Sequence, residues 1–594
     1  MKRLLLSMFI VSMAMTMSAV PALKTWRTYT QSDGTQIELM LMGDENFHYY
    51  RTTDGLAVME ETGNYYYANV KGQYIQRSEL LAHAPSLRSA AEKAAIAELG
   101  TADASNMRRL RANMPQVTQP RKVGDPSGAF TGSKRGLVIL VCFDDLDFQS
   151  EDPKAVFSEM VNKEGYSNAW GARGSVHDYF LAQSAGVFDL TFDVVGPYKA
   201  PKSVTYYGEN GNRGTDQANR VVELLKFGCE QANEEVNFKD YDWDNDGEVD
   251  QVYLLYAGQG EAGGGESYTI WPHESQIGKW PVAYRLDGIV VNTYACGEEL
   301  NYNGQLSGLG TFCHEFSHCL GLPDFYDTTA NDGVSEGNYG MGSWDVMCAG
   351  CYNHNSWIPA AYTGYERNFC NWIEYQELTD PCKVSSLEPI AEGGQVFIYY
   401  NPANHNEYFL FEHRNNSVGW DRGVSGKGLL IYHVNYNSTR WRNNTVNTTG
   451  FGKPCMAVCP ADNDPSVYSE VGDLFPYTST LPIRTYKEFS DDTTPADEVY
   501  NSNSDGTHLL HIKLSNITYT KKTKTVSFVF NDGTEEYVST GINEVVKAQG
   551  GACVGIYDLS GVRVSHSADD ITNLPHGFYI IKQADGTTRK VMVK

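Results

Sequence analysis

The sequence predicts a chain of several domains, in which an α/β domain lies between an α+β segment and all-β modules. Its 594 residues exceed the size at which one hydrophobic core stops growing. Helix and strand patterns alternate in the central part, whereas short strands separated by Asn, Asp and Gly follow it. The expected units are a leader (1–22), an N-terminal α+β segment (23–122), an α/β domain (123–378), a β-sandwich (379–533) and a small C-terminal β module (540–594).

The first 22 residues have the pattern of a secretory signal peptide. Lys2 and Arg3 precede an apolar run that ends in small residues near Ala19 or Ala22. A membrane anchor is the alternative, but the run is short and no later stretch resembles a transmembrane span. We therefore expect a soluble protein that is secreted or held at the cell surface. The formal net charge of -26 argues against nucleic acid and anionic membranes as partners.

Residues 23–122 contain no cysteine and read as a separable segment. The aromatic strand patterns GDENFHYYRTTDG and NYYYANVKGQYIQ precede an Ala-rich helical stretch at 86–111. Basic residues near Pro and Gly then offer sites for a trypsin-like cut: Arg108, Arg109, Arg111, Arg121 and Lys122. The segment is thus either a removable propeptide or a domain followed by an ordinary linker.

The α/β pattern begins after Arg135, where the run GLVILVCF predicts a buried strand. Ser175 and Asp178 form a capping-box pattern at the start of a helix, and the strand FDLTFDVVG follows. A helix near 216–233 and the strand QVYLLYAG continue the alternation. These patterns predict an α/β domain that extends to about residue 378.

An acidic loop, DWDNDGEVD at 242–250, has the pattern of a calcium-binding loop. Hard Ca²⁺ prefers such oxygen clusters, and Gly247 permits the tight turn. Tyr253 stands where a bidentate glutamate is expected, so another segment or water must complete the shell. A solvated acidic turn is the alternative. The candidate Ca²⁺ ligands are Asp242, Asp244, Asp246, Glu248 and Asp250.

Residues 314–324 read HEFSHCLGLPD, a layout typical of hydrolytic zinc sites. Positions four apart project from one side of a helix, so His314 and His318 can bind the same Zn²⁺ ion. Glu315 is placed to take a proton from a metal-bound water as general base. Asp324 can serve as third ligand, which leaves a fourth position for water and substrate. A core helix with two satisfied histidines is the alternative, but the five matched positions disfavour it.

The surroundings of the motif support a helix that ends before Asp324. Gly321 supplies a left-handed residue at the helix end, and Pro323 prevents a restart. The apolar residues of the helix gather opposite the histidines: Phe312, Phe316, Cys319 and Leu320. Such a hydrolytic site also favours the propeptide interpretation of 23–122, because an exported hydrolase benefits from being latent.

The C-terminal part has only strand patterns, and the cysteines begin in the α/β domain. VFIYY, YFLFEH, GLLIYHV, HLLHIKL and VSFVF predict the β-sandwich. All twelve cysteines lie from Cys142 onward, an even number that permits disulfides in an exported chain. Local candidates are Cys348/Cys351, Cys370/Cys382 and Cys455/Cys459. Structural zinc or a redox pair is disfavoured, so we expect disulfides or buried thiols.

The segments HEFSHCLGLPDFYD and GSWDVMCAG resemble the immune inhibitor A family of secreted metallopeptidases, which are metzincin-like zinc proteases. The DxDxDGxxD loop, GDENFHYY and the FLFEHR and GLLIYHV strands extend the likeness over most of 30–440. The resemblance implies a metzincin-like zincin domain with His314, His318 and Asp324 as zinc ligands, Glu315 as base, and Met347 in the turn beneath the metal. It also makes Tyr352 the candidate for stabilising the oxyanion. Met347 as plain core filler is the alternative.

The last fifty-odd residues, with YDLSG, LPHGFYII and KVMVK, resemble the sorting domain of type IX secretion cargo. This likeness implies contact with secretion machinery, and an ordinary β accessory domain is the alternative. For the whole chain we expect an exported zinc endopeptidase that acts on protein or peptide substrates. The competing hypotheses are an adhesion protein with a degenerate metallopeptidase domain and a zinc hydrolase that is not a peptidase.

Overall fold

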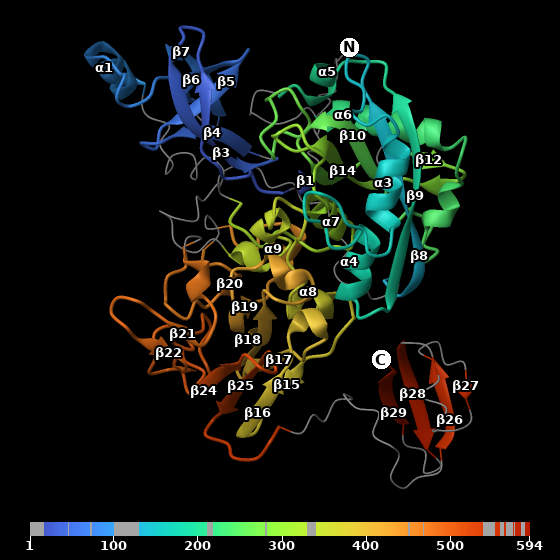
Figure 1. Cartoon of the computed structure of the whole chain (residues 1–594), viewed down its shortest axis with the longest axis vertical. Helices are drawn as coiled ribbons and strands as arrows, with labels where there is room; N and C mark the ends of the chain where they lie inside the picture. Colours follow the sequence, from blue (N-terminus) through green and yellow to red (C-terminus); the bar gives the residue numbers. More distant parts are fainter. Residues whose placement is uncertain are drawn as a thin grey trace, which may run out of the picture.

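Figure 1 shows a computed structural model of the chain, which runs from a blue N-terminal sheet through a green α/β domain to yellow and red β-sheets. The residues that the structure describes are 17–18, 20–45, 47–71, 74–99, 130–210, 218–278, 282–328, 340–448, 452–466, 469–537, 553–558, 563–565, 574, 577–583 and 588–593. Within these ranges, no helix is long and apolar enough to span a membrane.

The N-terminal segment is an antiparallel meander whose strands pair in chain order. Its elements are β2 (Arg27–Thr30), β3 (Gln36–Asp44), β4 (Phe47–Thr52), β5 (Ala57–Glu61), β6 (Asn64–Lys71), β7 (Tyr74–Leu81) and helix α1 (Ala90–Glu98). Ser89 caps α1 by accepting the Glu92 N–H. The basic residues proposed for cleavage, from Arg108 to Lys122, lie outside the described residues.

The α/β domain is built on a six-stranded sheet with the order β1-β11-β14-β10-β8-β9. Its strands are β1 (Met17–Ser18), β8 (Gly132–Cys142), β9 (Phe188–Lys199), β10 (Tyr253–Gln259), β11 (His273–Gln276) and β14 (Thr293–Leu300). β9, β8, β10 and β14 are parallel, whereas β11 runs antiparallel to β14 and β1 antiparallel to β11. A short hairpin, β12 (Arg285–Leu286) and β13 (Ile289–Val290), lies apart from this sheet.

Helices cover both faces of this sheet, which explains the continuous apolar run of β8. Leu137, Ile139 and Val141 pack into the core formed with α6, whereas Val138 and Leu140 enter the core shared with the zinc-motif helix. The helices are α3 (Pro153–Asn162), α4 (Val176–Gln183), α5 (Val204–Gly208), α6 (Ala218–Ala232), α7 (Leu309–Cys319) and α8 (Gly364–Phe369). The predicted capping box is present at the start of α4.

Two facing sheets follow the α/β domain and share one apolar core. The first contains β15 (Gln376–Glu377), β17 (Phe397–Asn401), β18 (Asn404–Asn415), β19 (Lys427–Asn435) and β20 (Met456–Val458). The second contains β16 (Cys382–Leu387), β23 (Phe489–Ser490), β24 (Lys513–Thr520) and β25 (Thr525–Phe530). Helix α9 (Ser438–Arg442) lies between β19 and β20, and β21 (Tyr477–Thr478) pairs with β22 (Thr485–Tyr486).

The C-terminal module is a four-stranded antiparallel sheet. Its strands are β26 (Cys553–Asp558), β27 (Arg563–Ser565), β28 (Gly577–Gln583) and β29 (Thr588–Val593). Eleven described cysteines from Cys142 to Cys459 form no disulfides, and most of them are buried. The suggested disulfides Cys348/Cys351, Cys370/Cys382 and Cys455/Cys459 are therefore wrong, and the buried-thiol alternative holds, because these side chains fill apolar cores.

Candidate metal centre

Helix α7 presents the zinc motif, and its apolar side fixes it to the sheet. The ring of Phe312 stacks on Tyr253 of β10 with 3.8 Å between centroids. Phe316 packs against Phe180 of α4 at 5.0 Å and against Phe192 of β9 at 5.5 Å. The predicted apolar side of the helix thus enters the core and leaves the histidines on the opposite side.

Two glycines allow the close fit around α7. A Cβ on Gly310 would lie 1.9 Å from the Cys351 carbonyl oxygen, so only glycine permits this approach. Gly321 ends the helix with a φ of +97°, the left-handed conformation predicted for it. The chain turns there and brings Asp324 back to the histidines.

The structure brings His314, His318 and Asp324 together as three converging candidate ligands. The two Nε2 atoms lie 3.1 Å apart, and Asp324 Oδ1 lies 3.2 Å from His314 Nε2 and 3.3 Å from His318 Nε2. A tetrahedral zinc ion with bonds of about 2.0–2.1 Å holds its ligand atoms about 3.3–3.4 Å apart. The observed triangle has nearly these dimensions.

The hydrogen bonds of the histidines leave both Nε2 lone pairs directed at this triangle. His314 Nδ1 lies 2.7 Å from the Val346 carbonyl, and His318 Nδ1 lies 2.7 Å from the Leu322 carbonyl. A carbonyl can only accept, so each Nδ1 carries the proton and each neutral ring has an unprotonated Nε2. Two lone pairs and a carboxylate oxygen at these distances fit a shared cation, and the donor set suits zinc.

Asp324 is buried, with one carboxylate oxygen facing the two histidines and the other facing Asn444. Oδ2 accepts a hydrogen bond from Asn444 Nδ2, and the Asp324 N–H donates to Asn444 Oδ1 at 2.6 Å. Oδ1 takes no hydrogen bond from the described residues. It is therefore the oxygen available to a metal.

Glu315 is fully buried beside the ligands but is not one of the three. Burial raises the pKa of its carboxyl well above the usual range, although a backbone N–H bond opposes the shift. That N–H belongs to Val20 and lies 2.7 Å from Glu315 Oε1. The three candidate metal ligands are thus distinct from Glu315, whose carboxylate can exchange protons.

Residues 17–18 lie along the edge of the sheet, and Val20 reaches Glu315. β1 pairs with the edge strand β11, and Trp271 Nε1 donates to the Val20 carbonyl at 3.2 Å. Tyr352, the candidate for oxyanion stabilisation, donates its hydroxyl to the Pro21 carbonyl at 2.7 Å. Ala22 N–H then bonds to the Gly43 carbonyl at 2.9 Å and links this stretch to the N-terminal sheet. An extended segment of this chain therefore binds where an added strand would bind.

Met347 lies in the segment that holds the ring of His314 in place. It is fully buried, its carbonyl accepts the Phe325 N–H at 2.8 Å, and its own N–H donates to Asp345 at 2.7 Å. The preceding carbonyl, that of Val346, holds His314. The predicted turn thus connects the zinc motif with the chain beyond it.

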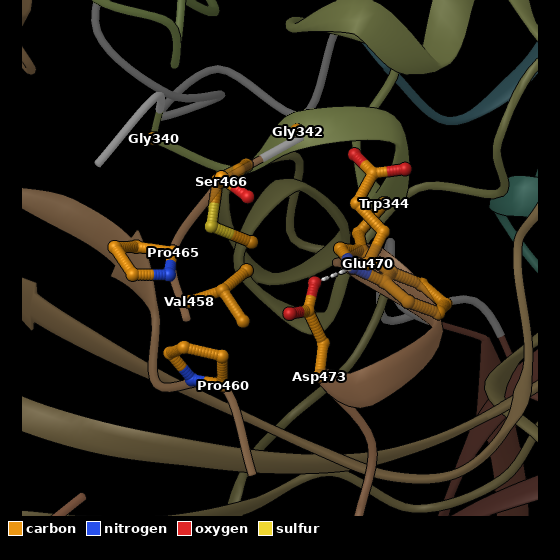
Figure 2. A pocket seen from close by; sticks show the side chains of 10 residues that line it. Gly340, Gly342, Trp344, Val458, Pro460, Pro465, Ser466, Glu470 and Asp473 are labelled. Atoms are coloured by element: carbon orange, nitrogen blue, oxygen red, sulfur yellow. Dashed lines mark hydrogen bonds between the residues drawn. The ribbon is translucent and has the colours of Figure 1, made fainter. Parts of the chain in front are cut away.

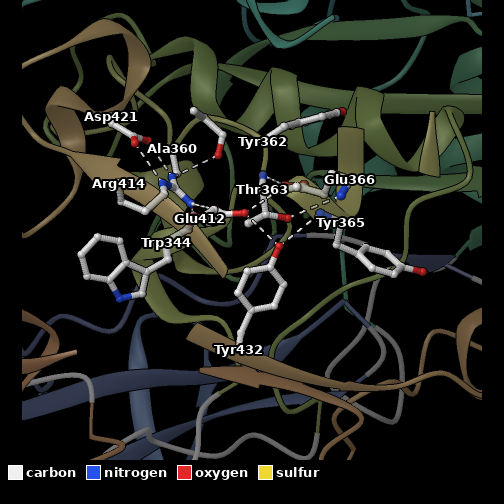
Figure 3. Close-up of polar contacts among 12 residues, drawn as sticks. Trp344, Ala360, Tyr362, Thr363, Tyr365, Glu366, Glu412, Arg414, Asp421 and Tyr432 are labelled. Atoms are coloured by element: carbon white, nitrogen blue, oxygen red, sulfur yellow. Dashed lines mark hydrogen bonds and ion pairs between the residues drawn. The ribbon is translucent and has the colours of Figure 1, made fainter. Parts of the chain in front are cut away.

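The β-sandwich supports this turn through a buried charge network, shown in Figure 3. Arg414 of β18 donates to the Trp344 carbonyl at 2.7 Å and pairs with Asp421 at 2.6 Å. Arg414 also lies 3.2 Å from Glu412, whose carboxylate accepts the Gly364 N–H. Next to Trp344 is a small pocket with two acidic groups, Glu470 and Asp473, on its wall (Figure 2).

Only three of the five candidate calcium ligands in the acidic loop lie close together. The carboxylates of Asp242, Asp244 and Asp250 lie within 4.8 Å of one another. Asp246 and Glu248 are not part of this group; Asp246 accepts the Glu248 N–H at 2.9 Å, and Glu248 accepts from Asn292 at 3.0 Å. Gly247 has the predicted left-handed φ, +91°. Calcium binding here stays a prediction.

Comparisons with known proteins identify the domain. The family described as "Immune inhibitor A peptidase M6, catalytic domain" matches residues 143–373. Pre-pro-metalloprotease PrtV of Vibrio cholerae is 25% identical over 332 residues, which cover 45% of this chain and 34% of PrtV. Immune inhibitor A of Bacillus thuringiensis is 25% identical over 304 residues, which cover 42% of this chain and 43% of that protein.

The comparisons also found two further similarities. A putative secreted metallopeptidase of Arthroderma benhamiae is 25% identical over 282 residues, which cover 41% of this chain and 39% of that protein. A crystal structure of metalloproteinase-II from Bacteroides fragilis covers 59% of this chain and 87% of that chain, at 11% identity and a TM-score of 0.20. A TM-score this low supports no argument about the fold.

These matches define the class of the domain as a metallopeptidase catalytic domain. Within that class, residues 143–373 match the immune inhibitor A family, which confirms the resemblance seen in the sequence for this part of the chain. The alignments span between a third and a half of the length of the curated relatives.

Three functional contacts were not predictable from the motif. Trp271, Val20 and Asn444 reach the site from other elements, and each lies at least 43 positions from the zinc motif. No spacing pattern relates them to HEFSH, because their proximity arises from tertiary packing alone. Of the three, only Val20 had a signal in the sequence, as a neighbour of the two candidate cleavage points Ala19 and Ala22.

Proposed function

We propose that the chain is an exported zinc endopeptidase in which His314, His318 and Asp324 bind zinc and Glu315 is the general base. The supporting observation is the buried triangle of two imidazole Nε2 atoms and one carboxylate oxygen, 3.1–3.3 Å on a side. When bound, zinc supplies a Lewis acid that polarises a peptide carbonyl and lowers the pKa of a water.

Glu315 carries out the proton transfers in this proposal. Its carboxylate takes a proton from the attacking water and passes it to the departing amine, so the same group serves as base and then as acid. Its low exposure excludes bulk water, which keeps the proton available for the amine. The apolar back of α7, through Phe312 and Phe316, keeps Glu315 at a fixed distance from the histidines.

We further propose that the N-terminal segment makes the precursor latent by occupying the substrate edge. The bond of Val20 to Glu315 and the bond of Tyr352 to Pro21 use groups that a substrate requires. Before signal-peptide cleavage, β1 also pairs with β11, which is the way in which an extended peptide would bind. A cut after Ala19 would remove β1 but keep the bonds made by Val20 and Pro21. The name of PrtV, a pre-pro-metalloprotease, agrees with synthesis as a precursor.

The position of signal-peptide cleavage decides whether this blockade persists after export. A cut after Ala19 leaves Val20 as the first residue, so its α-amino group would stand beside Glu315. A cut after Ala22 removes these contacts altogether. We propose the cut after Ala19, because Val20 and Ala22 are 1% and 2% exposed and form part of the central core.

Two accessory roles complete the proposal. Calcium at Asp242, Asp244 and Asp250 would stabilise the loop whose Trp243 ring packs 6.4 Å from Phe316 on the back of α7. The C-terminal sheet would contact the secretion machinery, as its likeness to sorting domains implies. Part of the tail motif YDLSG lies outside the described residues.

Glu315→Gln tests the proposal directly. The substitution retains the oxygen that accepts the Val20 N–H, so the zinc content should equal that of the parent chain. Hydrolysis of casein by the processed enzyme should fall by about 10²–10⁴-fold or more, the usual contribution of a general base. Digestion by the parent should also stop when a chelator removes zinc. Full activity of the variant would overturn the assignment of Glu315.

A further inference from the structure

The third zinc ligand is held by a residue outside the segment that matches the catalytic-domain family. Asn444 follows α9, between β19 and β20 of the β-sandwich, 120 positions after Asp324. Its Oδ1 accepts the Asp324 N–H at 2.6 Å, and its Nδ2 donates to Asp324 Oδ2. One carboxamide thus binds both the backbone and the side chain of a single residue.

This pair of bonds determines which carboxylate oxygen faces the histidines. With Oδ2 bound to Asn444, Oδ1 is left 3.2–3.3 Å from the two Nε2 atoms. Without the amide, the carboxylate could rotate about its χ2 bond, and a buried oxygen would lose its donor. Asn444 therefore orients Asp324 for binding through one oxygen.

The segment around Asn444 is itself fixed to the chain that follows the zinc motif. Asn447 Nδ2 donates to the Phe325 carbonyl at 2.7 Å, and the hydroxyls of Thr328 and Thr448 lie 2.6 Å apart. The backbone of Asn444 is left-handed, with a φ of +54°, a conformation that asparagine and glycine adopt most readily. The carboxamide is thus presented by an ordered turn.

We propose that Asn444 is a positioning residue for the third zinc ligand, so that the β-sandwich completes the metal centre. This inference rests on the zinc site of the proposed function. Partners of this kind usually change metal affinity by about 10–100-fold when they are removed.

Zinc affinity of the full chain, measured by competition with a chromogenic chelator, tests the proposal. Asn444→Gly keeps the left-handed backbone and removes the amide, so zinc binding should weaken by about 10–100-fold. Asn444→Asp places a second carboxylate against Asp324 Oδ2 and should weaken zinc binding further. Asn443→Asp makes the same change one residue earlier, where no bond to Asp324 exists, and should match the parent.

A double-mutant cycle separates positioning from general stabilisation. In an Asp324→Ala background, Asn444→Gly should cause no further loss of zinc affinity, because its effect acts through Asp324. A further loss in that background, or an Asn444→Gly affinity within twofold of the parent, would overturn the inference. If Asp324→Ala itself leaves zinc affinity unchanged, the zinc site of the proposed function fails instead.

Discussion

Tyr352→Phe should act in opposite directions on the precursor and on the processed enzyme. The substitution removes one hydroxyl, which donates to the Pro21 carbonyl at 2.7 Å in a partly buried position. Loss of a donor that leaves a buried acceptor unsatisfied costs about 1–3 kcal/mol. At about 1.4 kcal/mol per factor of ten, the N-terminal segment should leave the site about 5- to 150-fold more often.

The processed enzyme should instead become slower. A substrate carbonyl that Tyr352 contacts in the transition state would lose the same donor, so kcat/KM should fall by about 5- to 150-fold for the same 1–3 kcal/mol. Peptidase activity of the precursor would mix the two effects. A zinc-binding hydroxamate inhibitor separates them, because its apparent affinity for the precursor reports how often the site is open.

The assay compares both forms of Tyr352→Phe with Tyr302→Phe, a change at a side chain that is 40% exposed. Hydroxamate affinity for the precursor should increase and kcat/KM of the processed enzyme should decrease, whereas the control should change neither. An unchanged hydroxamate affinity of the Tyr352→Phe precursor would contradict the blockade by residues 20–22. An unchanged kcat/KM of the processed Tyr352→Phe enzyme would contradict the role of Tyr352 in binding substrate.

Three further predictions concern stability and pH. Phe316→Ala should lower the free energy of unfolding by about 3–5 kcal/mol in thermal or urea unfolding, because the ring is fully buried against other rings; a loss below 1 kcal/mol would contradict this. His48 of the N-terminal sheet lies 3.1 Å from Glu261 of the α/β domain. Burial acts to lower the pKa of His48, but the charge of Glu261 outweighs burial and raises this pKa. Protonation is thus favoured when the segment is docked, so docking should be tightest below pH of about 6.5 and weaken as pH rises through the raised pKa. Hydroxamate affinity for the precursor should increase over this range and stay flatter in His48→Gln; a decrease would contradict the sign. Burial raises the pKa of Asp473 to about 8, so its contribution to stability is lost as pH rises towards that value. Asp473→Asn keeps an acceptor for the Trp344 indole N–H, 2.6 Å away, and should raise the unfolding temperature more at pH 8 than at pH 5; an equal change at both would refute this.

The parts of the molecule that the sequence predicts are those set by local spacing. The ligands and base of the candidate site fall within eleven consecutive residues, so helical geometry and one glycine turn are enough to relate them. The capping box at Ser175 and the buried strand β8 are likewise local patterns with direct physical causes. Such features do not depend on how distant segments pack.

The features that sequence reasoning missed depend on distant contacts. Val20 reaches Glu315 across 295 positions, and Asn444 reaches Asp324 across 120. Cysteine spacing suggested disulfides, but a pair close in sequence bonds only if the side chains face each other, and Cys348 and Cys351 pack into the core instead. In the acidic loop, backbone N–H groups and Asn292 engage all five carboxylates, and only three of these come together.

X-ray absorption at the zinc edge, combined with metal analysis of the purified chain, identifies the atoms that bind zinc. If His314, His318 and Asp324 are the ligands, the spectrum should show one zinc ion per chain with only nitrogen and oxygen neighbours at about 2.0–2.2 Å, including two imidazoles, and His318→Ala should lose one imidazole. Zinc bound to sulfur at about 2.3 Å, as the buried thiols could provide, would contradict this assignment, as would a purified chain that binds no zinc.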